Sequence, residues 1–155
     1  MKILVGYNGG EAERLALSLA KNYAKSFSGF VYIVTSMEGG ASEKQTDIIR
    51  AEENLELASK IMSDSGIDYE TQQSVRGLSA GEDLVKFAEE NQIDHIFLGI
   101  RKKSKVQKAI LGSTAQHIIL KAACPVTTIR FDIDTIKPNE LLKDRQVLVV
   151  DDEPD

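Results

Sequence analysis

Residues 94–131 read DHIFLGIRKKSKVQKAILGSTAQHIILKAACPVTTIRF. This stretch predicts a buried strand over Asp94–Gly99, a basic loop, a helix from Gly112 to about Ala122, and a β-branched strand over Val126–Phe131. Short, continuous apolar runs are typical of parallel strands that are buried on both faces. Two such strands joined by a helix form a crossover between parallel strands, so the stretch indicates an α/β fold.

The residues before this stretch repeat the same alternation of strand and helix. Apolar residues recur at helical spacing between the strands, and the glycine-rich turns mark their ends. The sequence therefore predicts a doubly wound, open, five-stranded parallel sheet with helices on both faces. The third strand is more polar and is expected at or near a sheet edge. The remaining expected strands are Lys2–Tyr7, Phe30–Thr35 and Asp68–Val75, and the expected helices are Glu11–Lys25, Ser42–Ser65 and one that begins at Ser79. The helix over Ser42–Ser65 is expected to end at Gly66 and to bury a stripe that consists of Ile48, Ala51, Leu55, Ala58 and Met62.

Length and composition bound the class of protein. The chain has 155 residues, of which 42% are hydrophobic and 28% charged, and this suits one domain with an ordinary core. The sequence contains no apolar run long enough for a membrane span, and the N-terminus turns acidic and glycine-rich too early for a signal peptide. The single cysteine, Cys124, excludes an intramolecular disulfide framework. We expect a cytoplasmic protein that does not bind membranes.

Charge is unevenly distributed along the chain. The net charge is −5, yet residues 95–131 contain no Asp or Glu. An acidic chain with one basic segment argues against nucleic-acid binding and favours a local site for a small anion, although a solvated basic loop remains an alternative. The basic residues of this segment are Arg101, Lys102, Lys103, Lys105, Lys108, Lys121 and Arg130.

Unusual residues follow two of the expected strands. The first strand ends in Gly6–Gly10 (GYNGG) and the fourth in Gly99–Lys102 (GIRK). In doubly wound sheets, ligands bind beyond the carboxyl ends of the strands, at the point where the strand order reverses. If these strands are neighbours, they form a glycine-floored crevice with a basic rim. Gly112–Thr114 then adds free backbone N–H groups and two hydroxyls at a helix start, which together favour an anion.

Each of these features also has an ordinary structural explanation. The NGG sequence is a common turn, Gly99 can end a strand for steric reasons, and Gly112 with Ser113 can simply cap a helix. Their joint placement, more than any one of them, favours a phosphate site.

These residues also carry a family resemblance. Gly99, Lys102, then nine residues, then Gly112 and Ser113 resemble the nucleotide signature of universal stress proteins, which is glycine, two residues, glycine, nine residues, glycine, and serine or threonine. The opening KILVGYNGGEAERLAL, the SVRG segment with IDHIFLG, and the Cys-Pro-Val sequence at 124–126 are similar to the family's first, middle and last sections. The resemblance covers about residues 2–131.

The resemblance implies a fold, a ligand and a set of site residues. The family's strand order is 3-2-1-4-5, which makes strands one and four neighbours. The ligand implied is ATP, or AMP or ADP, with Mg²⁺ accompanying the nucleotide left open. By position, adenine would lie near Gly6, Tyr7, Asn8 and Ser36, and the phosphates and ribose near Gly99, Arg101, Gly112, Ser113 and Thr114.

Three departures from the family pattern bear on this expectation, one of which is Gly10, where the family usually has a serine after the first turn. Asn8 replaces the usual acid after the first strand; it can hydrogen-bond a base or ribose but offers no carboxylate to help hold a metal. Lys102 replaces the second motif glycine. Its ammonium group would neutralise phosphate, or its bulk would force the loop away.

The C-terminal residues predict a second feature. Residues 133–146 have the composition of a linker, with residues 1–132 forming the domain before it. Residues 147–155, VLVVDDEPD, resemble the start of a response-regulator receiver domain, in which a strand runs into paired acids. The alternative is an acidic tail that follows a chance strand.

No residue pattern predicts a catalytic centre. His95 falls within an expected strand, His117 within a helix and Cys124 in an apolar setting, so a structural role is expected for each. We expect a non-catalytic stress-response or signalling domain that binds an adenine nucleotide, with at most slow, incidental ATP hydrolysis. The alternative is a nucleotide-free dimerisation or docking module of a larger signalling protein. In either case the resemblance implies a homodimer that forms through Val126–Phe131.

Overall fold

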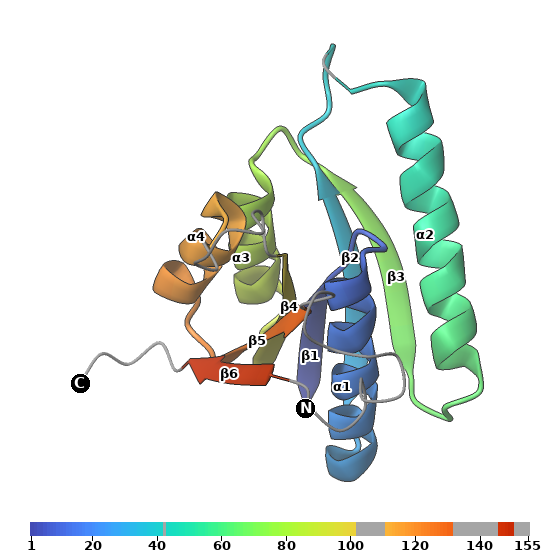
Figure 1. Ribbon diagram of the computed structural model, residues 1–155, viewed down its shortest axis with the longest axis vertical. Helices are drawn as coiled ribbons and strands as arrows, with labels where there is room; N and C mark the ends of the chain where they lie inside the picture. Colours follow the sequence, from blue (N-terminus) through green and yellow to red (C-terminus); the bar gives the residue numbers. More distant parts are fainter. Residues whose placement is uncertain (42, 102–110, 132–145, 151–155) are drawn as a thin grey trace.

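A computed structural model of the chain describes residues 1–41, 43–101, 111–131 and 146–150, and the statements below refer to these residues. Strands and helices alternate along the chain up to the last strand (Figure 1). The elements are β1 (Lys2–Gly6), α1 (Glu11–Phe27), β2 (Phe30–Met37), α2 (Gln45–Ser63), β3 (Tyr69–Val75), α3 (Ala80–Glu90), β4 (His95–Arg101), α4 (Ser113–Lys121), β5 (Val126–Phe131) and β6 (Gln146–Val150).

The strands form one sheet in the order β3-β2-β1-β4-β5-β6. The first five are parallel, which confirms the predicted fold class, the order 3-2-1-4-5 and the edge position of the third strand. β1 is therefore flanked by β2 and β4, and the strand order reverses at β1. This is the switch point at which doubly wound sheets bind their ligands.

A sixth strand extends the expected five-stranded sheet. β6 pairs antiparallel with β5, with Ile129 opposite Val147. The edge of Val126–Phe131, which the dimer hypothesis requires to be open, is thus occupied by the chain itself. The acids that suggested a receiver domain, and all but the last residue of the expected linker 133–146, lie outside the described residues.

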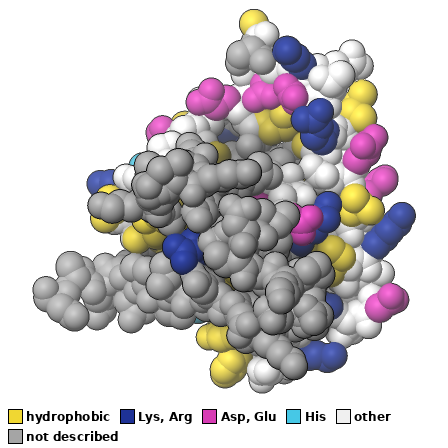
Figure 2. Space-filling model, viewed as in Figure 1, with side chains coloured by type: hydrophobic (Ala, Val, Ile, Leu, Met, Phe, Trp, Pro, Cys, Tyr) yellow, Lys and Arg dark blue, Asp and Glu magenta, His cyan; other side chains and the backbone are white. Residues whose placement is uncertain are grey.

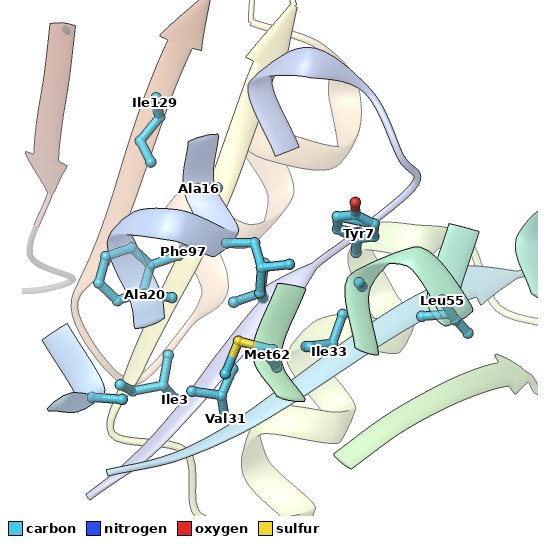
Figure 3. Packing of buried hydrophobic residues seen from close by; sticks show 14 residues of the cluster. Ile3, Tyr7, Ala16, Ala20, Val31, Ile33, Leu55, Met62, Phe97 and Ile129 are labelled. Carbon is cyan, nitrogen blue, oxygen red and sulfur yellow. The ribbon is translucent and has the colours of Figure 1, made fainter. Parts of the chain in front are cut away.

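Helices cover both faces of the sheet, as predicted, because strand side chains alternate between two apolar clusters. Along β1, Ile3 and Val5 pack with α1 and α2, whereas Leu4 packs with α3 and α4. Figure 3 shows the first cluster, with Met62 of α2 against Ile3, Val31 and Ile33. Burial on both faces is what the unbroken apolar strands of the sequence require.

The α2 helix differs from its expected bounds and face. It begins at Gln45, three residues after the expected start, and Ile48 is 39% exposed although it was placed on the buried stripe. The other four stripe residues are buried, and Gly66 adopts the predicted left-handed conformation after the helix. The α2 helix packs mainly over β3 and β2, at the β3 edge of the sheet, and it leaves apolar side chains at the surface, among charged ones (Figure 2).

Candidate functional site

A cavity of about 250 Å³ opens at the carboxyl ends of β1, β2 and β4, beneath the first turns of α3 and α4. This is the crevice that the sequence predicted beside the first and fourth strands. Seven of the ten predicted site residues line it: Gly6, Tyr7, Asn8, Ser36, Gly99, Gly112 and Thr114. The cavity is completed by Glu13, Val34, Thr35, Ala80, Leu84, Leu98, Ile100 and Ala115, which the sequence analysis did not select.

The other three predicted residues are Ser113, Arg101 and Lys102. Ser113 is the first residue of α4 and is exposed, and it is not part of the cavity wall to which Thr114 contributes, so its contact with a ligand stays a prediction. Successive helix residues point about 100° apart, so neighbouring hydroxyls cannot face one cavity equally. The backbone of Arg101 ends β4 beside Phe131. Lys102 lies outside the described residues.

The end of β1 forms one wall of the cavity. A Cβ atom on Gly6 would lie 3.1 Å from Leu84 Cδ1 and 3.2 Å from Leu98 Cδ2, so this glycine leaves room for the cavity's apolar side chains. The Tyr7 side chain packs in the α1–α2 core (Figure 3), and its burial raises the pKa of the phenol. The Tyr7 carbonyl accepts a 2.6 Å hydrogen bond from Thr35 Oγ1, which ties β1 to β2 at the cavity.

Asn8 stabilises the turn after β1 through two hydrogen bonds that it accepts. Its side-chain Oδ1 accepts a 3.1 Å hydrogen bond from the Gly10 N–H, and its carbonyl accepts a 3.0 Å bond from Asn54 Nδ2. Gly9 adopts a φ of +83°, where other residues are strained. The turn explanation for NGG is therefore correct, and the same turn places Asn8 at the cavity.

Gly99 is required by packing. A Cβ atom there would lie 2.4 Å from the carbonyl carbon of Ala12 and 2.5 Å from the backbone nitrogen of Glu13, both in the first turn of α1. The steric explanation for this glycine is thus correct, and it acts through α1. The close approach also brings Glu13, which is buried, to the cavity wall.

The first turn of α4 forms another wall of the cavity. Gly112 is the N-cap residue in extended conformation, with no side-chain cap, and its carbonyl accepts from Gln116 N. The N–H groups of the first helical turn have no acceptor within their own helix, and the helix dipole favours negative charge there. Thr114 adds a hydroxyl at the same wall.

A buried carboxylate lies directly behind the cavity. Asp83 of α3 is fully buried, accepts a hydrogen bond from Ser36 Oγ at 2.5 Å, and forms an ion pair with Arg76 at 2.6 Å. Burial alone would raise the pKa of Asp83, but the hydroxyls of Ser36 and Ser74 and the guanidinium of Arg76 stabilise the carboxylate and hold that pKa below its ordinary value of 3.8. Sequence reasoning missed this group because Asp83 follows Ser36 by 47 residues.

The remaining candidate residues are placed away from the cavity. His95 is buried at the amino end of β4, where it stacks on Phe97 and shares a 2.6 Å hydrogen bond with Thr127 Oγ1. Cys124 is buried in the α3–α4 cluster, and half-buried His117 packs beside Gly81. Within the described ranges, no three His, Cys, Asp or Glu side chains are grouped as metal ligands, and no helix has the length and apolarity to cross a membrane.

The strand order and the position of this cavity define a doubly wound α/β domain with a ligand site at its switch point. The chain belongs to the universal stress protein family, whose sequence model matches residues 1–130. It is 28% identical over 140 residues to a universal stress protein of Methanocaldococcus jannaschii, covering 83% of this chain and 81% of that protein.

Two solved structures from Archaeoglobus fulgidus share both fold and sequence. A universal stress protein matches at 36% identity with a TM-score of 0.74, over 83% of this chain and 92% of that one. A universal stress protein in complex with dAMP matches at 31% identity with a TM-score of 0.69, over 82% and 94% of the two chains.

Proposed function

We propose that this chain is a non-catalytic sensory domain of a cytoplasmic stress-response or signalling protein, and that it binds ATP or a related adenine nucleotide. The observation that carries the proposal is the cavity at the switch point, with an apolar wall, the first turn of α4 and two strand-end glycines. It is supported by the 31% identical family member, whose structure is a complex with dAMP.

The lining of the cavity suits both the base and the phosphate of a nucleotide. Val34, Leu84 and Leu98 offer apolar contact to a base, whereas the α4 start and Thr114 offer N–H and O–H donors to phosphate. Arg101, the last residue of β4, and Lys102, the next residue in the chain, would add positive charge there. Any ATP hydrolysis would be slow and incidental. His95 lies at the opposite end of β4 from the cavity.

Co-purified ligand gives the direct test. The purified chain is denatured, and the supernatant is separated by ion exchange against AMP, ADP and ATP standards. Calorimetry on the nucleotide-free protein, with and without Mg²⁺, then ranks the three ligands and tests whether a metal accompanies them. Absence of nucleotide in the first experiment together with absence of heat in the second would overturn the proposal and favour a nucleotide-free docking module.

We further propose a homodimer that uses Val126–Phe131, with β6 displaced or exchanged between protomers. β5 is apolar and β-branched, and such an edge pairs readily with a second strand. In the single chain β6 already satisfies this edge through backbone pairing, so self-association competes with it. Removal of β6 would distinguish pairing of β5 with its own β6 from pairing of β5 with a second chain.

A further inference from the structure

The α2 helix contacts the rim of the cavity through Asn54. Asn54 Nδ2 donates a 3.0 Å hydrogen bond to the carbonyl of Asn8, and Asn8 lines the cavity. A Cβ atom on Gly9 would lie 2.5 Å from Asn54 Cγ, so the Asn54 amide packs directly against the backbone of the turn. Leu55, the next residue of α2, belongs to the same apolar cluster as Tyr7 of the cavity wall (Figure 3). One turn of α2 therefore packs against the end of β1.

The Asn54 contact supports the position of the turn between β1 and α1. Inside the turn, Asn8 Oδ1 accepts a hydrogen bond from the Gly10 N–H at 3.1 Å, and Gly9 has a φ of +83°. The carbonyl of Asn8 receives its hydrogen bond from the other side, from α2. If α2 moves away, this carbonyl loses a donor, and the peptide that follows Asn8 is positioned by the turn alone.

The α2 helix is well placed to open locally. It packs mainly over β3 and β2, at the edge of the sheet. Its buried stripe includes the small side chains of Ala51 and Ala58, whereas Ile49 and Leu57 are exposed. Elements with few buried apolar contacts open at a lower free energy than the core of a fold. A single hydrogen bond can therefore change the equilibrium between attached and detached α2 measurably.

A second hydrogen-bonded contact attaches α2 to the sheet far from the cavity. The hydroxyls of Ser59 and Tyr69 are 2.6 Å apart, and the Tyr69 hydroxyl also lies 3.2 Å from the Ser59 carbonyl. Tyr69 is the first residue of β3, whereas the cavity opens at the carboxyl ends of its neighbours. The two contacts thus attach the same helix at different places, and only the contact of Asn54 involves the turn at the cavity.

We propose that Asn54 is a positioning residue for the ligand site, and that the Asn54–Asn8 hydrogen bond lets a bound ligand stabilise α2 against local opening. Coupling between two sites is reciprocal, so attached α2 strengthens binding by the same factor by which bound ligand reduces the opening of α2. One net hydrogen bond changes an equilibrium by about two- to tenfold, and we expect about fivefold here. The inference rests on the proposed nucleotide binding and goes beyond it, because it makes α2 the element that responds to occupancy.

The Asn54→Leu variant removes the donor with little change in side-chain volume. Leucine cannot donate a hydrogen bond to the Asn8 carbonyl, and its helix propensity is higher than that of asparagine, so α2 itself is not weakened. Ser59→Ala is the matched control. It removes a hydroxyl that attaches the same helix to β3 and leaves the hydrogen bonds of the Asn8 turn in place.

The experiment makes two measurements on wild type, Asn54→Leu and Ser59→Ala. Calorimetry gives the Kd of AMP, and mass spectrometry gives the hydrogen exchange of the α2 amides with and without saturating AMP. In wild type, AMP should slow α2 exchange by about fivefold. In Asn54→Leu, the Kd should rise by about fivefold, and AMP should no longer slow α2 exchange. In Ser59→Ala, α2 should exchange faster in both states, with a Kd within about twofold of wild type and the effect of AMP retained.

The outcomes separate this inference from the function on which it rests. If wild type binds no AMP, the proposed nucleotide binding fails, and the inference fails with it. If wild type binds AMP but Asn54→Leu, folded by circular dichroism, keeps the wild-type Kd, nucleotide binding stands and the positioning role of Asn54 is overturned. The same holds if AMP still slows α2 exchange in Asn54→Leu, because a merely structural Asn54 would behave as Ser59 does.

Discussion

The sharpest structural prediction concerns the two strand-end glycines, which differ in what a side chain would meet. At Gly99 an added Cβ would lie 2.4 Å from a backbone carbon of Ala12 and 2.7 Å from its carbonyl oxygen. At Gly6 the nearest atoms, at 3.1 and 3.2 Å, are the methyl ends of two leucines. Backbone in a helix cannot move independently of the helix, whereas a leucine methyl can rotate away. The same glycine-to-alanine change should therefore have different effects at the two sites.

In Gly99→Ala, α1 must move away from β4 by about an ångström to relieve the contact with the new methyl group. The expected loss in the free energy of unfolding is that of a severely overpacked core. We expect a loss of about 3 kcal/mol, at the upper end of the usual range for added methylenes. For a domain of this size this corresponds to a fall in Tm of about 10 °C. Gly6→Ala should cost about 1 kcal/mol or less, because only side chains adjust.

Thermal and urea denaturation of the two variants beside wild type measure this difference. Gly6→Ala should keep its Tm within a few degrees and lose affinity for AMP, since Leu84 and Leu98 are pushed into the cavity they line. Wild-type stability in Gly99→Ala would refute the reasoning, because it would mean that the α1–β4 contact is not the reason for glycine at this position.

Three further predictions concern the site and the sheet edge. Gly112→Val should abolish binding of AMP and ATP in calorimetry with little change in Tm, because a β-branched side chain at the α4 N-cap occupies the approach of the phosphate; retained wild-type affinity would contradict the assignment. The pKa of Asp83 is lower in the folded chain than its ordinary value, so its ionisation stabilises the fold above about pH 4 and this contribution is lost as the pH falls through the folded-state pKa. The Tm advantage of wild type over Asp83→Asn should accordingly shrink between pH 6 and pH 3, and a constant difference would be incompatible with that assignment. A chain that ends at Asp132 lacks β6, so sedimentation equilibrium should show tighter dimers than for the full chain; equal association would argue against β5 as the dimer edge.

The parallel core of the fold could be predicted because its signals are local. Unbroken apolar runs mark strands buried on both faces, and helical spacing of alanine and leucine marks the crossovers between them. Ile48 shows the limit of this reasoning, since helical periodicity places it on the stripe with Ala51 but cannot tell how far the sheet extends beneath α2. The apolar pattern of Gln146–Val150 predicts a strand, but it does not predict that this strand pairs antiparallel with β5.

The parts of the candidate site that consist of turns, strand ends and helix starts could be predicted from the sequence. The parts that depend on contacts between residues far apart in the sequence could not. Turn glycines, strand ends and a helix start are visible in sequence, and they placed Gly6, Asn8 and Gly112 at one cavity. The reason for Gly99 was not visible, because it lies in the approach of α1. Nor could the sequence show how the strands and helices align, which decides which side chains meet at the cavity wall.

Asp83 shows why this matters for function. In the sequence it is one of several acids on a helix, for which a solvated surface position is the ordinary expectation, and the structure instead buries it completely. A buried carboxylate persists where its partners outweigh its desolvation, and here Arg76 and Ser36 each take one oxygen. Because Ser36 also lines the cavity, the need of the buried Asp83 carboxylate for a hydrogen-bond donor fixes the direction of a hydroxyl at the cavity wall.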